Sequence, residues 1–161
     1  AFDMFEALNT TGEPLTAFET FEPRIIESEG LETYEDSEAH TQVQRVKNYL
    51  DQFIQDTTRV QKNTSDLLVS FALSDTGRKL GGKLNEQRRY LRRRFDEPGT
   101  AKSRSAFFLR LGDVADFMST AWEVDKDTAL KPLAFTDEQT TVCLDYLRRQ
   151  NHTDTVAPLS R

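Results

Sequence analysis

Apolar residues recur at intervals of three and four positions along most of this chain, and that spacing constrains its fold more than any other feature. It is the spacing of residues that share one face of an α-helix. No segment alternates apolar and polar residues over the length that a β-strand needs. We therefore expect an all-α or mainly α protein, folded as an irregular bundle of about six to seven helices.

The longest periodic run predicts one long helix over residues 38–62. The sequence DLLVSFAL follows; it is apolar on most sides and predicts a short central helix capped by Thr64 or Ser65. Two later helices are expected to end near Glu97 and near Asn151. Another helix between them has a wide apolar face, made of Phe107, Phe108, Leu111, Val114, Met118 and Trp122.

The last helix is expected to begin at Thr136, because Thr136 and Gln139 have the spacing of a capping box. This helix contains the single cysteine of the chain, Cys143, at a position that suits a small buried residue. We interpret Cys143 as a thiol of the core. His40 and His152 lack neighbouring metal ligands in the sequence and are expected on the surface. The sequence thus predicts neither a metal site nor a catalytic residue.

The N-terminal region predicts a helix, a tight loop and a second helix. Residues 2–8 have helical spacing, and the turn sequence TTGEP follows them. Thr16 and Glu19 have capping-box spacing and start the second helix, which Pro23 is expected to end or kink. Because the N–H groups at a helix start are free, we expect the loop from Asn9 to Thr16 to face a phosphate. The alternative is that the loop only makes a sharp turn.

The sequence FEALNTTGEPLTAFE, residues 5–19, resembles a signature of the ParB-like domain of GmrSD-type modification-dependent restriction proteins and related phage-defence proteins. The resemblance implies that residues 1–28 are the end of such a nucleotide-hydrolysing domain. It also implies that the loop of this segment binds a nucleotide. The residues to which we assign nucleotide binding are Asn9, Thr10, Gly12 and Thr16.

The catalytic motif of this family, a DGQQR-like sequence, lies well upstream of the signature, and the sequence in hand begins too late to include it. We therefore expect a fragment that is inactive alone and holds no cofactor, with an NTP and a divalent cation bound by the parent protein. The sequence NEQRR at 85–89 looks similar to the motif, but it lies in a helical pattern and follows the signature. We interpret that likeness as coincidence. An HNH-type nuclease, which proteins of the family often carry, needs clustered metal ligands that this sequence lacks.

Charge is unevenly distributed along the chain. Residues 1–40 hold 11 acidic and 1 basic side chains, residues 41–110 hold 7 acidic and 15 basic ones, and residues 111–161 hold 9 acidic and 5 basic ones. The acidic stretch before residue 41 is poorly periodic and is interpreted as a linker or mobile loop. The expected units after residue 28 are an acidic linker over 29–40, a helical domain over 41–152 and a tail over 153–161.

Arginines crowd one predicted helix, and they are Arg88, Arg89, Arg92, Arg93 and Arg94. At 100° per residue, Arg89 and Arg93 lie opposite the apolar face of that helix. One interpretation is a solvated face paired with acids, and the other is a surface that contacts phosphates. Tyr90 is the only aromatic candidate for base stacking, so backbone contact without base reading is the expected mode. The residues to which we assign nucleic-acid binding are Arg88, Arg89, Arg92 and Arg93.

Two functions remain open. In the first, the chain belongs to a cytoplasmic, nucleotide-dependent DNA restriction or anti-phage defence protein, where the helical part supports the NTPase domain and contacts the DNA backbone. In the second, it is a non-enzymatic helical module for a protein or nucleic-acid partner. The expected partners are the missing N-terminal ParB-like segment, DNA and a second copy of the chain. A membrane is not expected, because no apolar run approaches the ~18 residues that a span needs.

Overall fold

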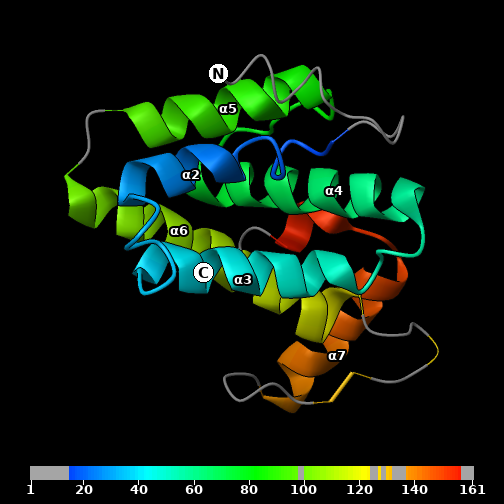
Figure 1. Ribbon diagram of the computed structural model, residues 1–161. Helices are drawn as coiled ribbons and strands as arrows, with labels where there is room; N and C mark the ends of the chain where they lie inside the picture. The colour runs from blue at the N-terminus through cyan, green and yellow to red at the C-terminus, as the bar shows by residue number, and fades with distance from the viewer. Residues whose placement is uncertain (1–14, 98–99, 124–126, 128–129, 132–136, 157–161) are drawn as a thin grey trace.

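The computed structural model describes residues 15–97, 100–123, 127, 130–131 and 137–156, and this part of the chain consists of helices joined by turns and loops, without a β-strand (Figure 1). The all-α prediction is thereby confirmed. The α-helices are α2 (Glu22–Glu29), α3 (Glu38–Asp51), α4 (Thr57–Thr76), α5 (Leu84–Asp96), α6 (Ala101–Phe117) and α7 (Glu138–Arg149). A π-helix, Met118–Trp122, continues α6, and a 3-10 turn, Thr153–Thr155, follows α7. None of the helices in the described ranges is long and apolar enough to cross a lipid bilayer.

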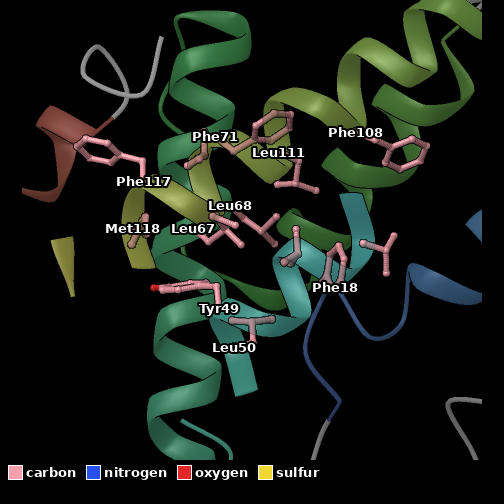
Figure 2. Close-up of a cluster of buried hydrophobic side chains, with 14 of the residues drawn as sticks. Phe18, Tyr49, Leu50, Leu67, Leu68, Phe71, Phe108, Leu111, Phe117 and Met118 are labelled. Atoms are coloured by element: carbon pink, nitrogen blue, oxygen red, sulfur yellow. The ribbon is translucent and has the colours of Figure 1, made fainter. Parts of the chain in front are cut away.

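The helices surround one contiguous cluster of buried apolar side chains, shown in part in Figure 2. Helix α4 supplies Leu67, Leu68 and Phe71 to this core, and all three are fully buried. Figure 1 shows α5 along one edge of the bundle, with α3 on the other side of α4. Helices α3 and α6 make the most extensive contact between two of the described helices. The edge position of α5 leaves one of its faces open to solvent.

The close contact of α3 with α6 depends on a glycine. Arg45 of α3 donates from Nε to Asp116 at 2.8 Å and from Nη2 to Asp113 at 2.7 Å, both in α6. A Cβ on Gly112 would lie 2.6 Å from Oε1 of Gln42 and 2.9 Å from Nη1 of Arg45. Gly112 therefore allows the two side chains of α3 to lie directly against the α6 backbone.

The capping box predicted at the start of the described chain is confirmed. The Thr16 N–H donates to Oε2 of Glu19 at 2.7 Å, and the Glu19 N–H donates to Oγ1 of Thr16 at 3.2 Å. The helix that was expected to start at Thr16 begins instead at Glu22, because residues 17–21 form turns. Pro23, expected to end or kink that helix, lies in its first turn. A proline is tolerated there because the first N–H groups of a helix have no intrahelical acceptor.

The described part of the N-terminal segment packs on the same core as the helices that follow it. Phe18 and Phe21 are 1% and 2% exposed, and the Phe21 ring meets the Phe95 ring edge-on at 5.4 Å. Within the stretch interpreted as a linker, Tyr34 is buried and Ser37 caps α3 by accepting from the His40 N–H. This stretch is therefore packed where the sequence favoured a mobile loop, because one aromatic residue anchors it.

The single long helix expected over 38–62 is wrong, because the chain turns between α3 and α4. Asp56 caps α4 by accepting from the Arg59 N–H at 3.2 Å. Phe53 lies in the turn, yet it is buried against the Tyr49 ring at 5.5 Å. The apolar spacing thus continues through the break, and periodicity alone could not reveal it. Helix α4 then runs to Thr76, so the separate short helix at DLLVSFAL is also wrong.

The C-terminal region differs from expectation in three details. Helix α7 is capped by Asp137, which accepts from the Thr140 N–H, and Thr136 lies outside the described residues. Cys143 is exposed, and its interpretation as a core thiol is wrong. The buried face of α7 carries Thr141, Leu144 and Arg148, and Cys143 lies on the opposite side at helical spacing.

Candidate nucleic-acid interface

Helix α5 divides into a buried face and a basic outer face. Gln87, Leu91 and Phe95 point into the protein, and these positions are separated by one turn each. Arg89 and Arg93 are exposed, with 68% of the Arg93 side chain accessible. The prediction that these two arginines lie opposite the apolar face is confirmed. Their charges are therefore accessible to solvent.

A hollow lies between α5 and the connection from α4 to α5. It consists of two overlapping cavities of ≈ 310 Å³ and ≈ 380 Å³ that share Lys79, Leu80, Tyr90 and Arg93. We name this feature the α5 hollow. Its cationic lining comes from two segments, Arg78 and Lys79 of the connection and Arg89 and Arg93 of α5, and its lining includes one acid, Glu86.

The cations of the α5 hollow are weakly neutralised. Lys79 pairs with Asp154 at 2.9 Å, but both side chains are more than half exposed. Arg93 Nε lies 3.9 Å from Glu97 Oε1. For Arg78 and Arg89, no carboxylate of the described residues lies within ion-pair distance. Exposed pairs contribute only about 0–1 kcal/mol, so an incoming anion can replace these partners at little cost.

A buried ionic network fixes the wall of the hollow. Asp75 of α4 is 1% exposed at its side chain and accepts from Arg94 Nε at 2.6 Å. Arg110 of α6 lies 2.9 Å from the same carboxylate, and the Tyr90 hydroxyl donates to it at 3.0 Å. The network joins α4, α5 and α6 through one acid. Tyr90, which lines the hollow, is therefore anchored to Asp75 through its hydroxyl.

The titration behaviour of this network follows from its contacts. Burial alone would raise the pKa of Asp75, but hydrogen bonds from Arg94 and Tyr90 and the charges of Arg94 and Arg110 lower it below its ordinary value. Burial, followed by the Asp75 charge, raises the pKa of Tyr90 well above its ordinary value. Tyr90 thus stays a protonated donor and Asp75 an ionised acceptor at neutral pH.

The structure separates the four arginines to which the sequence assigned nucleic-acid binding. Arg89 and Arg93 line the α5 hollow. Arg88 lies on the opposite flank of α5, where its Nη2 donates to the Leu15 carbonyl at 3.2 Å. Arg92 is half-buried and is not part of the lining of the hollow.

Sequence reasoning missed the two basic residues of the connection, Arg78 and Lys79. A signal was present, because a basic pair directly follows Gly77, which ends α4 in the left-handed conformation at φ +69°. Such a glycine directs the chain sharply out of the helix and back toward its neighbours. A basic pair at that point lies near the next helix, which carries the arginines.

The proposed nucleotide-binding residues lie mostly outside the described chain. Asn9, Thr10 and Gly12 are not among the described residues. Thr16 is buried, and the N–H groups of Thr16 and Glu19 are both occupied by the capping box. The expectation that these two donors are free is therefore wrong. Nucleotide binding by this segment stays a prediction.

Within the described ranges, no three His, Cys, Asp or Glu side chains come close enough together to hold an ion. His40 Nδ1 lies 2.9 Å from the Glu35 carbonyl oxygen, and its Nε2 lies 3.1 Å from the amide nitrogen of Gln44. His152 is exposed beyond the end of α7. The site with the clearest ligand chemistry in this part of the chain is thus the α5 hollow.

The sequence matches no protein-family model. It matches no curated protein. The resemblance of residues 5–19 to a ParB-like domain therefore stays a prediction that rests on those residues alone.

Proposed function

We propose that this chain is the helical part of a nucleotide-dependent DNA restriction or anti-phage defence protein, and that its α5 hollow contacts the DNA backbone. The observation that carries the DNA contact is the meeting of four cations from two segments around one open hollow. The link to restriction and defence rests on the resemblance of residues 5–19 to ParB-like domains. Nucleotide hydrolysis is assigned to the parent protein.

The chemistry of the hollow suits phosphate oxygens. Guanidinium groups donate two parallel hydrogen bonds to a phosphate, and lysine adds a compact charge. The Tyr90 ring is only 5% exposed and its hydroxyl is bonded to Asp75, so it offers no face on which an unpaired base can stack. Contact with the backbone of a duplex is favoured over binding of a single strand. Such contacts position a protein without reading the sequence.

The charge of the rest of the chain is consistent with a local contact. The formal net charge is −6, so the molecule as a whole does not attract a polyanion. The basic surplus is confined to residues 41–110. An acidic remainder limits unspecific wrapping of DNA and directs contact to the basic edge of α5.

A second candidate function is supported by α7. Val142 and Tyr146 are 63% and 61% exposed and lie one turn apart, which gives this helix an apolar strip on its open side. Such a strip suits a helical module that binds another protein. In that function, the α5 hollow binds acidic side chains of the partner.

The DNA contact is tested by neutralising the two arginines of α5. For Arg89→Gln/Arg93→Gln, we expect affinity for a duplex to fall roughly 60-fold near 0.1 M salt. Each phosphate contact makes log K fall by about 0.9 per unit of log salt, so at 0.1 M one contact is worth about eightfold in affinity and two are worth roughly 60-fold. Fluorescence anisotropy with a labelled duplex measures this change. The matched control, Lys62→Gln/Lys131→Gln, removes two charges from exposed sites outside the hollow and should bind nearly as the wild type.

The control separates a local contact from a general charge effect. Equal losses in both double variants would show that only net charge matters, and this would contradict the α5 hollow as the contact. If the wild type binds an acidic protein but no duplex, the second function is favoured. Thermal unfolding of each variant verifies that the fold is retained, which we expect because all four side chains are exposed.

A further inference from the structure

A second basic hollow lies on the same flank of α5, next to α6. It has a volume of ≈ 320 Å³ and is lined by Arg94, Glu97, Ser103, Arg104, Ala106, Phe107 and Arg110. We name it the α5–α6 hollow. Three guanidinium groups surround it, against Glu97 in the lining and Asp75 buried behind it. The hollow therefore has three positive charges against two negative ones, a net charge of +1.

Two of these three arginines keep donors for a ligand. Arg110 is half exposed, and its Nη2 lies 2.9 Å from Asp75 Oδ1. The Arg104 guanidinium carbon lies 5.2 Å from the centre of the Phe95 ring, its Nε is buried, and its Nη1 donates to Ser28 Oγ at 3.4 Å. Nη2 is therefore the Arg104 nitrogen that remains for a ligand, because the described residues give it no hydrogen-bond partner. Each guanidinium carries five N–H donors, so both groups can serve an additional oxyanion. Arg94 is already engaged by Asp75 and Glu97.

The two hollows share a wall. Tyr90 lines the α5 hollow and Arg94 lines the α5–α6 hollow, and both donate to Oδ2 of Asp75, at 3.0 Å and 2.6 Å. The two residues lie one turn apart on α5. The α5 residues that line the α5 hollow are centred about 7 Å from Arg94 along the helix axis, at about 1.5 Å per residue.

We infer that the DNA contact of the proposed function continues from the α5 hollow into the α5–α6 hollow, so that one strand of a duplex runs along this flank of α5. One strand advances about 3.4 Å per nucleotide along the duplex axis, so the hollows receive phosphates roughly two nucleotides apart. Arg104 and Arg110 are then phosphate contacts in addition to those of the α5 hollow. This inference rests on the proposed function.

A free nucleotide is a poorer fit to the second hollow. Its volume lies at the low end of the range of about 300–1,000 Å³ for ligand pockets. Phe107, the aromatic residue in its lining, is 3% exposed and packed edge-on against Phe71 at 5.2 Å. No ring face is therefore free to hold a base, whereas guanidinium groups suffice for a phosphate.

The test compares the salt dependence of duplex binding by variants of the full chain. For Arg104→Gln/Arg110→Gln, we expect the slope of log K against log salt to lose about 1.8 in magnitude, at about 0.9 per contact. Because Arg110 also contacts Asp75, Arg104→Gln alone is the second variant, with an expected loss of about 0.9 in slope and about eightfold in affinity near 0.1 M salt. Lys62→Gln/Lys131→Gln is again the charge-matched control.

The outcomes separate this inference from the proposed function. If Arg89→Gln/Arg93→Gln loses slope while Arg104→Gln keeps the wild-type slope, the extension is overturned and the contact at the α5 hollow stands. If the wild-type protein binds no duplex, both are overturned. Independent losses that add in the combined four-residue variant support one continuous path.

Discussion

Replacing Asp75 with Asn is expected to lower the free energy of unfolding by about 3 kcal/mol, the lower end of the usual cost of breaking a buried ion pair. The side chain is 1% exposed and accepts from groups on α5 and α6. Asparagine keeps the shape but removes the charge that balances Arg94 and Arg110. The lower end applies because Arg94 and Arg110 reach solvent and are partly screened.

The same variant should change the acid sensitivity of the protein. The pKa of Asp75 is lower in the folded protein than its ordinary value of 3.8. Its contribution to stability is therefore present above that ordinary value and is lost as the pH falls through the folded pKa. Urea unfolding followed by circular dichroism, at neutral and at acid pH, measures both effects. The wild type should lose more stability in acid than Asp75→Asn does.

A matched carboxylate provides the control for Asp75. Asp66 also lies in α4, but its ion pair with Lys62 is exposed on the lysine side and spans one helical turn. Asp66→Asn should cost less than about 1 kcal/mol, as surface pairs do. If Asp75→Asn and Asp66→Asn are equally stable, the buried network does not hold α4, α5 and α6 together.

Replacing Phe71 with Ala is expected to lower the free energy of unfolding by about 4 kcal/mol, from lost burial and the cavity that remains. Phe71 of α4 is fully buried at the centre of the core shown in Figure 2. Its ring meets the Phe107 ring at 5.2 Å and the Tyr90 ring at 6.2 Å. The cavity therefore opens behind Tyr90, the wall of the α5 hollow.

A smaller change at the same site separates cavity formation from loss of the ring. Phe71→Leu refills most of the volume and should cost less than about 2 kcal/mol. Chemical unfolding of the three proteins gives the comparison. Equal stability of Phe71→Ala and the wild type would mean that Phe71 is not in the core.

The fold class could be predicted from the sequence because apolar residues at helical spacing share one face of a helix, and in the described residues that face is buried. Helix boundaries were harder to predict. The turn at residues 52–56 preserves the apolar spacing because Phe53 packs inward from outside a helix. Arg148 is fully buried beside Asp145 in α7, and Val156 is fully buried beyond it. Neither a buried arginine nor an ordered tail residue has a local signal.

Helical periodicity also allowed part of the candidate site to be predicted from the sequence. The outward direction of Arg89 and Arg93 depends on helical geometry alone, so 100° per residue predicted it. The contributions of Arg78 and Lys79 depend on how the connection folds back onto α5. The network around Asp75 depends on the meeting of three helices, and residues 19 and 35 positions apart form its ion pairs. Such tertiary contacts have no signature in one sequence.

Salt titration of duplex binding tests the proposed DNA contact most directly. Each phosphate contact contributes about −0.9 to the slope of log K against log salt. The four cations of the α5 hollow therefore predict a wild-type slope of about −3.6 or steeper. Arg89→Gln/Arg93→Gln should flatten that slope by about 1.8. A wild-type slope near zero, or an unchanged slope in the double variant, would contradict DNA backbone contact by α5.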